Sequence, residues 1–423
     1  MLQRFINLSL LPEKQMTMTN KNHIIIYIFL AMTTLSCNRQ SSFEEGSFGY
    51  DLKYLSTKDN VHILADEKGN AQIIVSAKYQ AKVFTSTANG LKGNSLGFVN
   101  YRALDSDIID PHMNGYGGEN RFWLGPEGGK YSIYFAPDVE QVFDNWHTPQ
   151  PIDIESWDIA SKSRNSISLM KEMSVANYCG VVLNLRVDRI ISLIERSEIE
   201  SVLGLKLTPQ VDVVAYMTIN TIINLNDFEW TKETGTICIW MLDMFKPGQK
   251  AITFIPFNEG NELEMGKIVT SDYFGDIPED RLKIKDRIIY LKTDGQYRSK
   301  LGVNGKRTNA IAGNYDPDSK RLTVVTFDVD RDAVYLNQEW NPDRDPLQGD
   351  AMNAYNDGPL EDGSIMGPFL ELESVSPAAF LKPMESLSHK HSVFHFIGEE
   401  NVLEPVIQKL FGITPSEIQN IFK

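Results

Sequence analysis

Two glutamates near the C-terminal end of the chain are spaced so that they can act together. Glu371 and Glu373 alternate with leucines in the sequence FLELE, so on a β-strand both carboxylates point to one face, with Cβ atoms about 6–7 Å apart. Two like charges at that spacing raise the pKa of one carboxyl group, and a carboxyl group that titrates near neutral pH can act as a general acid or base. A solvated strand face without chemistry is the alternative interpretation.

A second candidate group stands in a glycine-rich segment with the sequence GGENRFWLGPEGGKYSIYF, residues 117–135. There Arg121, Trp123 and Glu127 combine a guanidinium group, an aromatic ring and a carboxylate. Aromatic faces can pack on the apolar face of a pyranose ring, and charged groups supply directed hydrogen bonds to its hydroxyl groups. The segment therefore suits sugar recognition, although an arginine between glycine-rich turns can equally be a structural ion-pair partner.

A third candidate is the YNDG turn, in which Asn356 and Asp357 precede a glycine. Its amide and carboxylate groups suit a loop that binds sugar hydroxyls, but Asn-Asp-Gly also forms a tight turn without any ligand. We expect this turn, the glycine-rich segment and the two strand glutamates to converge on one site. Further aromatic rings that could contact a sugar there are Phe122, Trp146 and Trp340.

Several segments of the chain resemble one protein superfamily. They are GDAMNAYNDGP, GPFLELESVSPAAFLKP and HKHSVFHF near the C-terminus, preceded by NTIINLNDFEWTKETGTICIWMLDMFKPG, DYFGDIPEDRL and DGQYRSKLGV. Over roughly residues 50–400 the chain is similar to the galactose-mutarotase-like superfamily, which includes the aldose 1-epimerases. It looks most like a subgroup of Bacteroidetes envelope lipoproteins. The resemblance implies one large antiparallel β-supersandwich with a sugar-sized concave face.

The resemblance also implies roles for individual residues. Aldose 1-epimerases use a strand carboxylate near the C-terminal end of the domain as the general base that removes the anomeric hydroxyl proton, and Glu371 or Glu373 matches that position. They also use two histidines, and His147, 26 residues after Arg121, can stand for the first. The chain has no histidine between His147 and His389, so the mid-domain general acid of those enzymes is missing.

The sequence therefore leaves three classes of function open. The first is a carbohydrate-active enzyme that works by acid/base chemistry, such as an epimerase. The second is a glycan-binding protein without turnover, which would explain the aromatic and amide-rich motifs without the missing histidine. The third is a structural protein of the cell envelope.

Two other clusters suggest metal binding only weakly. His389, His391 and His395 share one strand face, but the outer two would be about 20 Å apart and cannot share an ion. Because Val393 interrupts the histidines on that face while Phe394 and Phe396 alternate as core, we expect polar, outward-facing positions; a site of His389, His391 and a carboxylate is the alternative. The acidic loop of residues 343–345 with Asp350 could hold calcium but lacks the spacing of an EF-hand. We expect no metal and no other cofactor.

The N-terminal segment reads as an export signal. Lys21 precedes about nine apolar residues, and small residues then lead to Cys37, a pattern typical of a bacterial lipoprotein. We expect a signal peptide over residues 1–36, a tether over 37–47 that begins with the lipidated Cys37, and one domain over 48–423. The protein would then be lipid-anchored in the bacterial cell envelope, on the periplasmic side or the outer-membrane surface. An uncleaved anchor or a secreted chain are the alternatives.

The net charge of the chain limits the classes of partner it can bind, and its cysteines bear on disulfide formation. The chain has 41 Lys and Arg against 56 Asp and Glu, a formal net charge of −15, which offers no electrostatic footprint for nucleic acid. We expect carbohydrate as the partner, and membrane contact through the lipid anchor only. Cys179 and Cys238 could pair in an oxidising compartment or stay as two buried thiols.

Periodicity favours an all-β fold. Apolar residues alternate with polar ones between Val75 and Val83, and many short apolar runs follow, punctuated by Gly, Pro, Asn and Asp. Helices are few: one over 198–203 and a short helical segment at the C-terminus, where Thr414-Pro415-Ser416-Glu417 has the form of a capping box. These patterns predict a large antiparallel sandwich that ends in a short helical segment.

Overall fold

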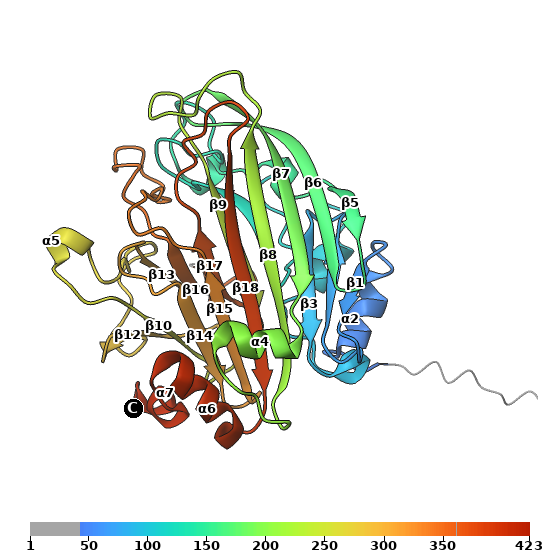
Figure 1. The fold of residues 1–423 in the computed structure, drawn as a ribbon. Coiled ribbons are helices and arrows are strands. Elements are labelled where there is room, and N and C mark those ends of the chain that lie inside the picture. The colour runs from blue at the N-terminus through green and yellow to red at the C-terminus, as the bar shows by residue number, and fades with distance from the viewer. Residues whose placement is uncertain (1–42, 361) are drawn as a thin grey trace, which may run out of the picture. The chain divides into compact units, whose positions relative to one another are not determined.

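The computed structural model describes residues 43–360 and 362–423 (Figure 1). The predicted signal peptide, Cys37 and the tether up to residue 42 lie outside the described residues. The last predicted tether residue, Ser47, accepts a hydrogen bond from the backbone N–H of Tyr50 and caps the first described helix.

Three antiparallel sheets make up most of the described chain. The largest has ten strands in the order β11 (Leu282–Lys285), β12 (Ile288–Lys292), β10 (Ile252–Pro256), β14 (Ile311–Asp316), β15 (Arg321–Phe327), β18 (Ser386–Ile397), β8 (Asp212–Asn224), β7 (Val182–Leu193), β6 (Ser166–Ala176) and β5 (Asp158–Lys162). The second has five strands in the order β13 (Ser299–Val303), β16 (Met352–Asn356), β17 (Leu370–Val375), β9 (Cys238–Phe245) and β4 (Arg121–Gly125). The smallest consists of β1 (His62–Ala65), β2 (Gln72–Ser76) and β3 (Lys82–Thr87).

The alternating run predicted between Val75 and Val83 is not one continuous strand. The structure divides it into β2 and β3, which pair with each other across a turn. Gln80 and Ala81 adopt positive φ angles of 61° and 50° in that turn, a conformation that ends an extended strand. The local pattern was therefore right about strand type and wrong about continuity.

The five-stranded and ten-stranded sheets pack face to face. One hydrophobic cluster joins Ile239 and Leu372 of the smaller sheet to Val187, Val325 and Val393 of the larger. This two-layer packing is how antiparallel sheets bury their apolar faces. It confirms the predicted all-β antiparallel class.

Helices α4, α6 and α7 lie over the lower part of the other face of the ten-stranded sheet (Figure 1). Phe394 and Phe396 of β18 lie in a second cluster with Leu403, Ile407 and Ile418. The described helices are α2 (Phe48–Leu55), α3 (Tyr101–Asp105), α4 (Arg196–Leu203), α5 (Glu262–Met265), α6 (Glu400–Phe411) and α7 (Pro415–Asn420). Short 3₁₀ turns are η1 (Gly90–Lys92), η2 (Phe143–Asn145) and η3 (Gln150–Ile152). The predicted capping box is present in α7, where the side chains and backbones of Thr414 and Glu417 bond reciprocally.

The packing of β18 against the five-stranded sheet corrects the expectation for the C-terminal histidines. His389, His391 and His395 are fully buried and point into the space between the two large sheets, not to solvent. Their face of β18 packs against the five-stranded sheet, whereas on the opposite face the C-terminal helices cover Phe394 and Phe396 and leave Ser388 and Lys390 exposed. Within residues 43–360 and 362–423, no group of three or more His, Cys, Asp or Glu could hold a metal ion.

The two cysteines of the domain differ in exposure and do not pair. Cys238 is buried in β9, whereas Cys179 is exposed in the turn between β6 and β7, so the expectation of two buried thiols holds for Cys238 alone. Among the described helices none is long and apolar enough to cross a membrane.

Candidate functional site

Strand pairing decides which side chains of the five-stranded sheet share a face. Asp243 and Ser374 hydrogen-bond to His391 of the facing sheet, at 2.7 and 2.8 Å. Leu242 and Glu373, one residue away and opposite each other in the register, therefore point away from the sandwich interior. We call this side the outer face of the five-stranded sheet.

Charged and aromatic side chains from every strand of the sheet share this outer face. β17 contributes both predicted glutamates, and the register places Tyr355 opposite Glu371 and Asn353 opposite Glu373. β13 adds Lys300, opposite Tyr355. The remaining two strands add Arg121, Trp123 and Trp240, with the two tryptophans opposite each other.

Each glutamate has a cationic partner. Arg121 forms an ion pair with Glu371, and both side chains are less than 10% exposed. Lys300 lies 3.0 Å from Oε2 of Glu373, and this pair is more deeply buried. The arginine expected to bind a ligand is thus held by a protein carboxylate, which is the structural role that the sequence left open.

Trp240 completes the environment of Glu373. Its indole N–H donates to Oε2 of Glu373 at 2.8 Å, and its ring lies 4.8 Å from the ammonium of Lys300. Trp123 contacts the same indole edge to face at 5.6 Å, and the guanidinium of Arg121 lies 5.2 Å from the Trp123 ring. Charge and aromatic surface are therefore interleaved, as sugar-binding sites require.

Two buried polar atoms on this face lack a partner in the described part of the chain. They are Oε1 of Glu373 and Nε of Arg121. Buried polar atoms are nearly always hydrogen-bonded, so each is a candidate contact for a ligand.

Burial shifts the pKa of the Glu371 carboxyl group upward. It raises the pKa of Glu371 well above its usual value; Arg121 lowers it less, and the neighbouring Glu373 raises it further. The like-charge effect predicted from the sequence therefore has the expected direction, but burial is the larger cause.

Glu127, in the loop after β4, joins the same electrostatic cluster. Its backbone N–H donates to Gln338 at 3.2 Å, and the neighbouring Trp340 lowers the pKa of its carboxyl group slightly. Burial raises its pKa to about 7, opposed by Lys300 and reinforced by Glu373. Although part of Glu127 reaches solvent, protein surrounds its carboxyl group closely enough to favour the neutral form.

A loop between α5 and β11 covers the outer face. The hydroxyl of Tyr273 donates to Asp350 at 2.7 Å and accepts from Asn353 at 3.3 Å. Phe274 contacts the ring of Tyr355 at 6.0 Å and stacks 3.8 Å from the guanidinium carbon of Arg298. Asp350, predicted as part of a calcium loop, instead anchors this cover, and burial raises its pKa to about 6.

The YNDG turn organises the loops beside the site. Asn356 lies on the inner side of β16, where it donates to the carbonyl of Tyr297 at 2.8 Å and accepts from Gly295 at 2.9 Å. Asp357 accepts from the Tyr355 hydroxyl at 3.1 Å and from the Gly367 N–H at 2.8 Å. Both side chains are buried and positioned by the protein, so they support the site from the side.

His147 does not join the hydrogen-bond network of the two glutamates in the described part of the chain. Its ring is exposed, stacks on His112 at 4.8 Å, and its Nδ1 lies 2.8 Å from the carbonyl oxygen of Pro111. No hydrogen bond or ring contact joins it to Glu371 or Glu373 among the described residues.

Sequence reasoning missed three residues of the cluster: Lys300, Trp240 and Tyr273. The first two occupy ordinary strand positions in SKLGV and CIWMLDMF, where the alternation gives a face but not a neighbour. Only the pairing of β13, β16, β17 and β9 brings them to Glu373.

A family profile matches nearly the whole described chain. The profile is that of a family of unknown function (DUF6786), and it covers residues 46–422. The chain belongs to this family. We find no curated protein with a similar sequence.

Several solved structures have a similar backbone fold and a low sequence identity to this chain. The Slr1438 protein from Synechocystis sp. PCC 6803 is 13% identical with a TM-score of 0.48, over 80% of this chain and 96% of that one. A galactose mutarotase-like protein from Lactobacillus casei is 10% identical with a TM-score of 0.46, over 79% and 100%. A galactose mutarotase related enzyme from Lactobacillus acidophilus is 7% identical with a TM-score of 0.43, over 80% and 98%. Likeness at this level says nothing about the activity of this family.

Proposed function

We propose that the outer face of the five-stranded sheet binds a sugar and transfers protons at its anomeric centre. The observation that carries the proposal is the environment of Glu373. Its carboxylate is fully buried, one oxygen is held by Lys300 and Trp240, and the other has no partner in the described chain. Leaving such an atom unpaired is costly, and a sugar hydroxyl supplies the missing donor.

The rest of the face suits the same ligand. Trp123 and Trp240 make the face aromatic beneath Arg121 and Lys300, and Nε of Arg121 is a second unpaired atom, here a donor for a ring or hydroxyl oxygen. Donors, acceptors and aromatic faces thus occur together on one buried surface, which is the composition that a polyhydroxylated ligand needs.

The proposed chemistry is exchange of anomers through the open-chain sugar. Glu373 accepts the proton of the anomeric hydroxyl, a carbonyl forms at C1 as its bond to the ring oxygen breaks, and a neutral carboxyl group donates a proton to that oxygen. Glu127, with a pKa of about 7, is the donor at hand, because Glu371 is ion-paired with Arg121. Glu127 would serve in place of the mid-domain histidine that the sequence lacks.

Sugar binding without turnover is the second candidate function. It is favoured by the ion pair between Arg121 and Glu371, which engages one carboxylate, and by the cover that Tyr273 and Phe274 form. A site of this kind would recognise a sugar through the same unpaired atoms.

NMR measurement of the exchange between sugar anomers separates these two functions. We expect the protein to accelerate the exchange of α- and β-anomers of D-glucose or D-galactose, followed by NMR, and Glu373→Gln to abolish the acceleration while the circular dichroism spectrum is unchanged. Glu399→Gln, in an exposed ion pair with Lys320, is the matched control and should keep full activity. Binding detected by calorimetry without acceleration of anomer exchange would select the second candidate. If the protein shows no binding and no acceleration, the proposal is refuted.

We further propose that the protein is an envelope lipoprotein anchored through Cys37. Support comes from the sequence alone: a basic residue, an apolar stretch of signal-peptide length and small residues before the cysteine. The wild-type chain should incorporate a palmitate analogue in bacteria, and Cys37→Ala should not. Equal labelling of the two proteins would contradict the anchor.

A further inference from the structure

The side chains of the proposed sugar site are buried in this structure. Glu373, Lys300 and Trp240 are 0%, 7% and 2% exposed, and Trp123 is 6% exposed. Oε1 of Glu373, the atom that lacks a hydrogen-bond partner in the described chain, is buried as well. A sugar therefore reaches these groups only after a covering segment has moved.

One covering segment is the loop between α5 and β11. We call residues 271–280 the cover loop. The ring centre of Tyr273 lies 5.6 Å from the ammonium of Lys300, and its hydroxyl group accepts a hydrogen bond from Asn353 at 3.3 Å. Asn353 stands opposite Glu373 in the strand register. The cover loop therefore lies over the part of the outer face that holds the proposed base.

The cover loop is bound to the rest of the domain at both ends. Just before it, Thr270 exchanges two backbone hydrogen bonds with Gly302, at 2.9 and 2.7 Å. Just after it, the carbonyl of Arg281 accepts from the backbone N–H of Lys292 at 2.9 Å. Between these points, no backbone hydrogen bond of the described chain joins residues 271–277 to another segment. The middle of the loop is therefore held by side chains alone.

Two neighbouring side chains hold the middle of the loop. The hydroxyl group of Tyr273 donates to Asp350 at 2.7 Å, and Phe274 stacks 3.8 Å from the guanidinium carbon of Arg298. Phe274 is nevertheless 45% exposed. A segment with few backbone hydrogen bonds and few buried contacts opens locally at a small cost in free energy, while the rest of the domain stays folded.

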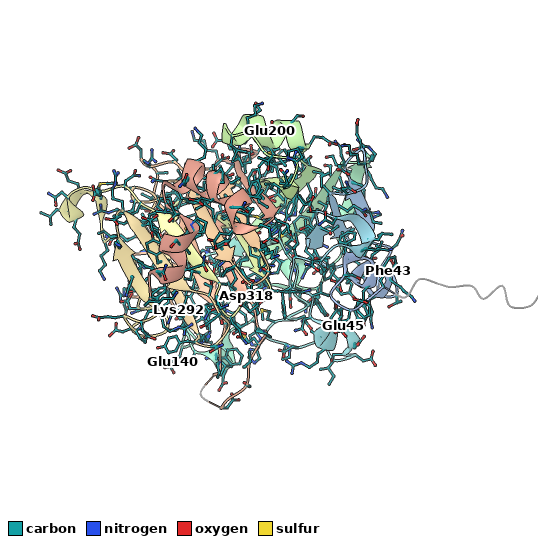
Figure 2. All side chains as sticks on the ribbon, turned by 90° about the horizontal axis from the view of Figure 1, so that it is seen from below. Phe43, Glu45, Glu140, Glu200, Lys292 and Asp318 are labelled. Atoms are coloured by element: carbon teal, nitrogen blue, oxygen red, sulfur yellow. The ribbon has the colours of Figure 1, made fainter. Side chains whose placement is uncertain are left out.

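The chain beside the cover loop faces solvent. Figure 2 shows the yellow helix α5, which precedes the loop, at the outer edge of the molecule, as Figure 1 does. Leu263 of this helix is 96% exposed. Asp272, Gly275 and Asp276 of the loop are exposed too. An outward movement of the loop therefore disturbs no packed layer on that side.

The loop after β4, which carries Glu127, is held more firmly. The backbone of Gly129 exchanges two hydrogen bonds with the side chain of Gln141, at 2.8 and 2.9 Å. The hydroxyl group of Tyr134 donates to the carbonyl of Leu124 at 2.8 Å. Because such bonds fix this loop along its length, the cover loop is the segment that can give way.

We propose that the cover loop is a lid, which opens to admit the sugar and then closes over it. The inference rests on the proposed function, and it makes this structure the closed state of the site. In that state water is kept from Glu373 and Lys300, and charge interactions are stronger without water between the groups. Opening breaks the side-chain contacts of Tyr273 and Phe274, whereas the backbone bonds at the two ends of the loop remain.

Labelling of a thiol beneath the lid measures how often it opens. Asn353→Cys places that thiol under Tyr273, and Tyr355→Cys, under Phe274, is a second position if the first variant does not fold or does not bind sugar. Both are made in a chain that begins after Cys37 and carries Cys179→Ser, so that Cys238 is the only other thiol. Reaction with iodoacetamide, followed by mass spectrometry of the peptides, gives a separate rate for each thiol.

We expect the introduced thiol to react at least about tenfold faster than Cys238, which is buried in β9 and reacts only when the whole domain unfolds. Low concentrations of urea should raise the rate of Cys238 steeply and that of the introduced thiol only slightly, because lid opening exposes little surface. Tyr273→Phe and Phe274→Ala should each speed the reaction of the introduced thiol about three- to tenfold, since a hydrogen bond or a cation–π contact is lost. Leu263→Ala is the matched control and should have no effect.

The sugar that binds the same variant in calorimetry, D-glucose or D-galactose, tests the link between the lid and the ligand. At about ten times its dissociation constant, this sugar should slow the reaction of the introduced thiol about tenfold, because it stabilises the closed lid.

Three results would overturn the lid and leave the proposed function standing. The first is one common rate and one urea dependence for the introduced thiol and Cys238. The second is a labelling rate that Tyr273→Phe and Phe274→Ala change no more than Leu263→Ala does. The third is unchanged labelling in the presence of a sugar that binds. If neither sugar binds to the wild type, the proposed function fails and the inference falls with it.

Discussion

Replacing Lys300 by methionine leaves the carboxylate of Glu373 buried without its ion-pair partner. The Glu373 side chain is fully buried, its Oε1 already has no partner in the described chain, and Trp240 would remain as its sole donor there. Breaking a buried ion pair from one side costs about 3–5 kcal/mol, because the remaining charge stays desolvated. Methionine keeps the length and the apolar stem of lysine, so the change removes charge with little loss of packing.

Urea denaturation followed by tryptophan fluorescence measures this cost. We expect Lys300→Met to lower the free energy of unfolding by about 3–5 kcal/mol, and the double variant Lys300→Met with Glu373→Leu to recover most of it, since both charges are then gone. Lys250→Met is the matched control: Lys250 pairs with Asp318 at 2.7 Å with both side chains about half exposed, so the loss should stay below about 1 kcal/mol.

A small effect of Lys300→Met, equal to that of Lys250→Met, would refute the reasoning. It would mean that Glu373 is neutral or reaches water in solution, and the argument for a buried base would go with it. A double variant less stable than the single one would show that the pair is a net source of stability.

Three further predictions follow from burial. Burial lowers the pKa of His389 from 6.5 to about 3, so the unfolded state binds more protons than the folded state below pH 6.5, and the folded protein loses stability as the pH falls towards 3. The urea midpoint of His389→Gln should therefore fall less steeply with decreasing pH than that of the wild type. Burial raises the pKa of Glu127 from 4.5 to about 7, so the folded state holds the extra proton and stability falls as pH rises through that range; Glu127→Gln should therefore be more stable than the wild type at pH 8, with no difference at pH 4, and an equal difference at both would contradict this. In a chain that begins after Cys37, a thiol reagent should modify Cys179 in the native protein and Cys238 only in urea; two reactive thiols in the native state would count against the burial of β9.

The space between the large sheets holds a buried polar network in addition to apolar side chains. Asp243 bonds His391 at 2.7 Å and Asn120 at 2.6 Å, while Arg189 bonds Asn120 and the backbone of Ala81. The network links the ten-stranded sheet, the five-stranded sheet and the turn between β2 and β3. Because a half-satisfied network is costly, it favours one relative arrangement of these parts, and that arrangement also sets the outer face on which the site stands.

Local sequence patterns were sufficient for the strand class, the C-terminal helices and the shared direction of two glutamates. The alternation in β17 alone places Glu371 and Glu373 on one face, because successive side chains of a strand point to opposite sides. The capping box at Thr414 likewise depends on four consecutive residues. These features are decided within a few residues, so the sequence determines them without knowledge of the rest of the chain.

The tertiary structure determined which side chains those residues contact and whether they are buried. Lys300 reaches Glu373 because β13 pairs with β16 and β16 with β17, and no spacing in the sequence encodes that order of strands. His389, His391 and His395 are internal because their face of β18 packs against the five-stranded sheet; alternation gives two faces but does not say whether water or protein covers each. Local periodicity fixes direction, whereas burial, partners and pKa values depend on contacts between residues far apart in the chain.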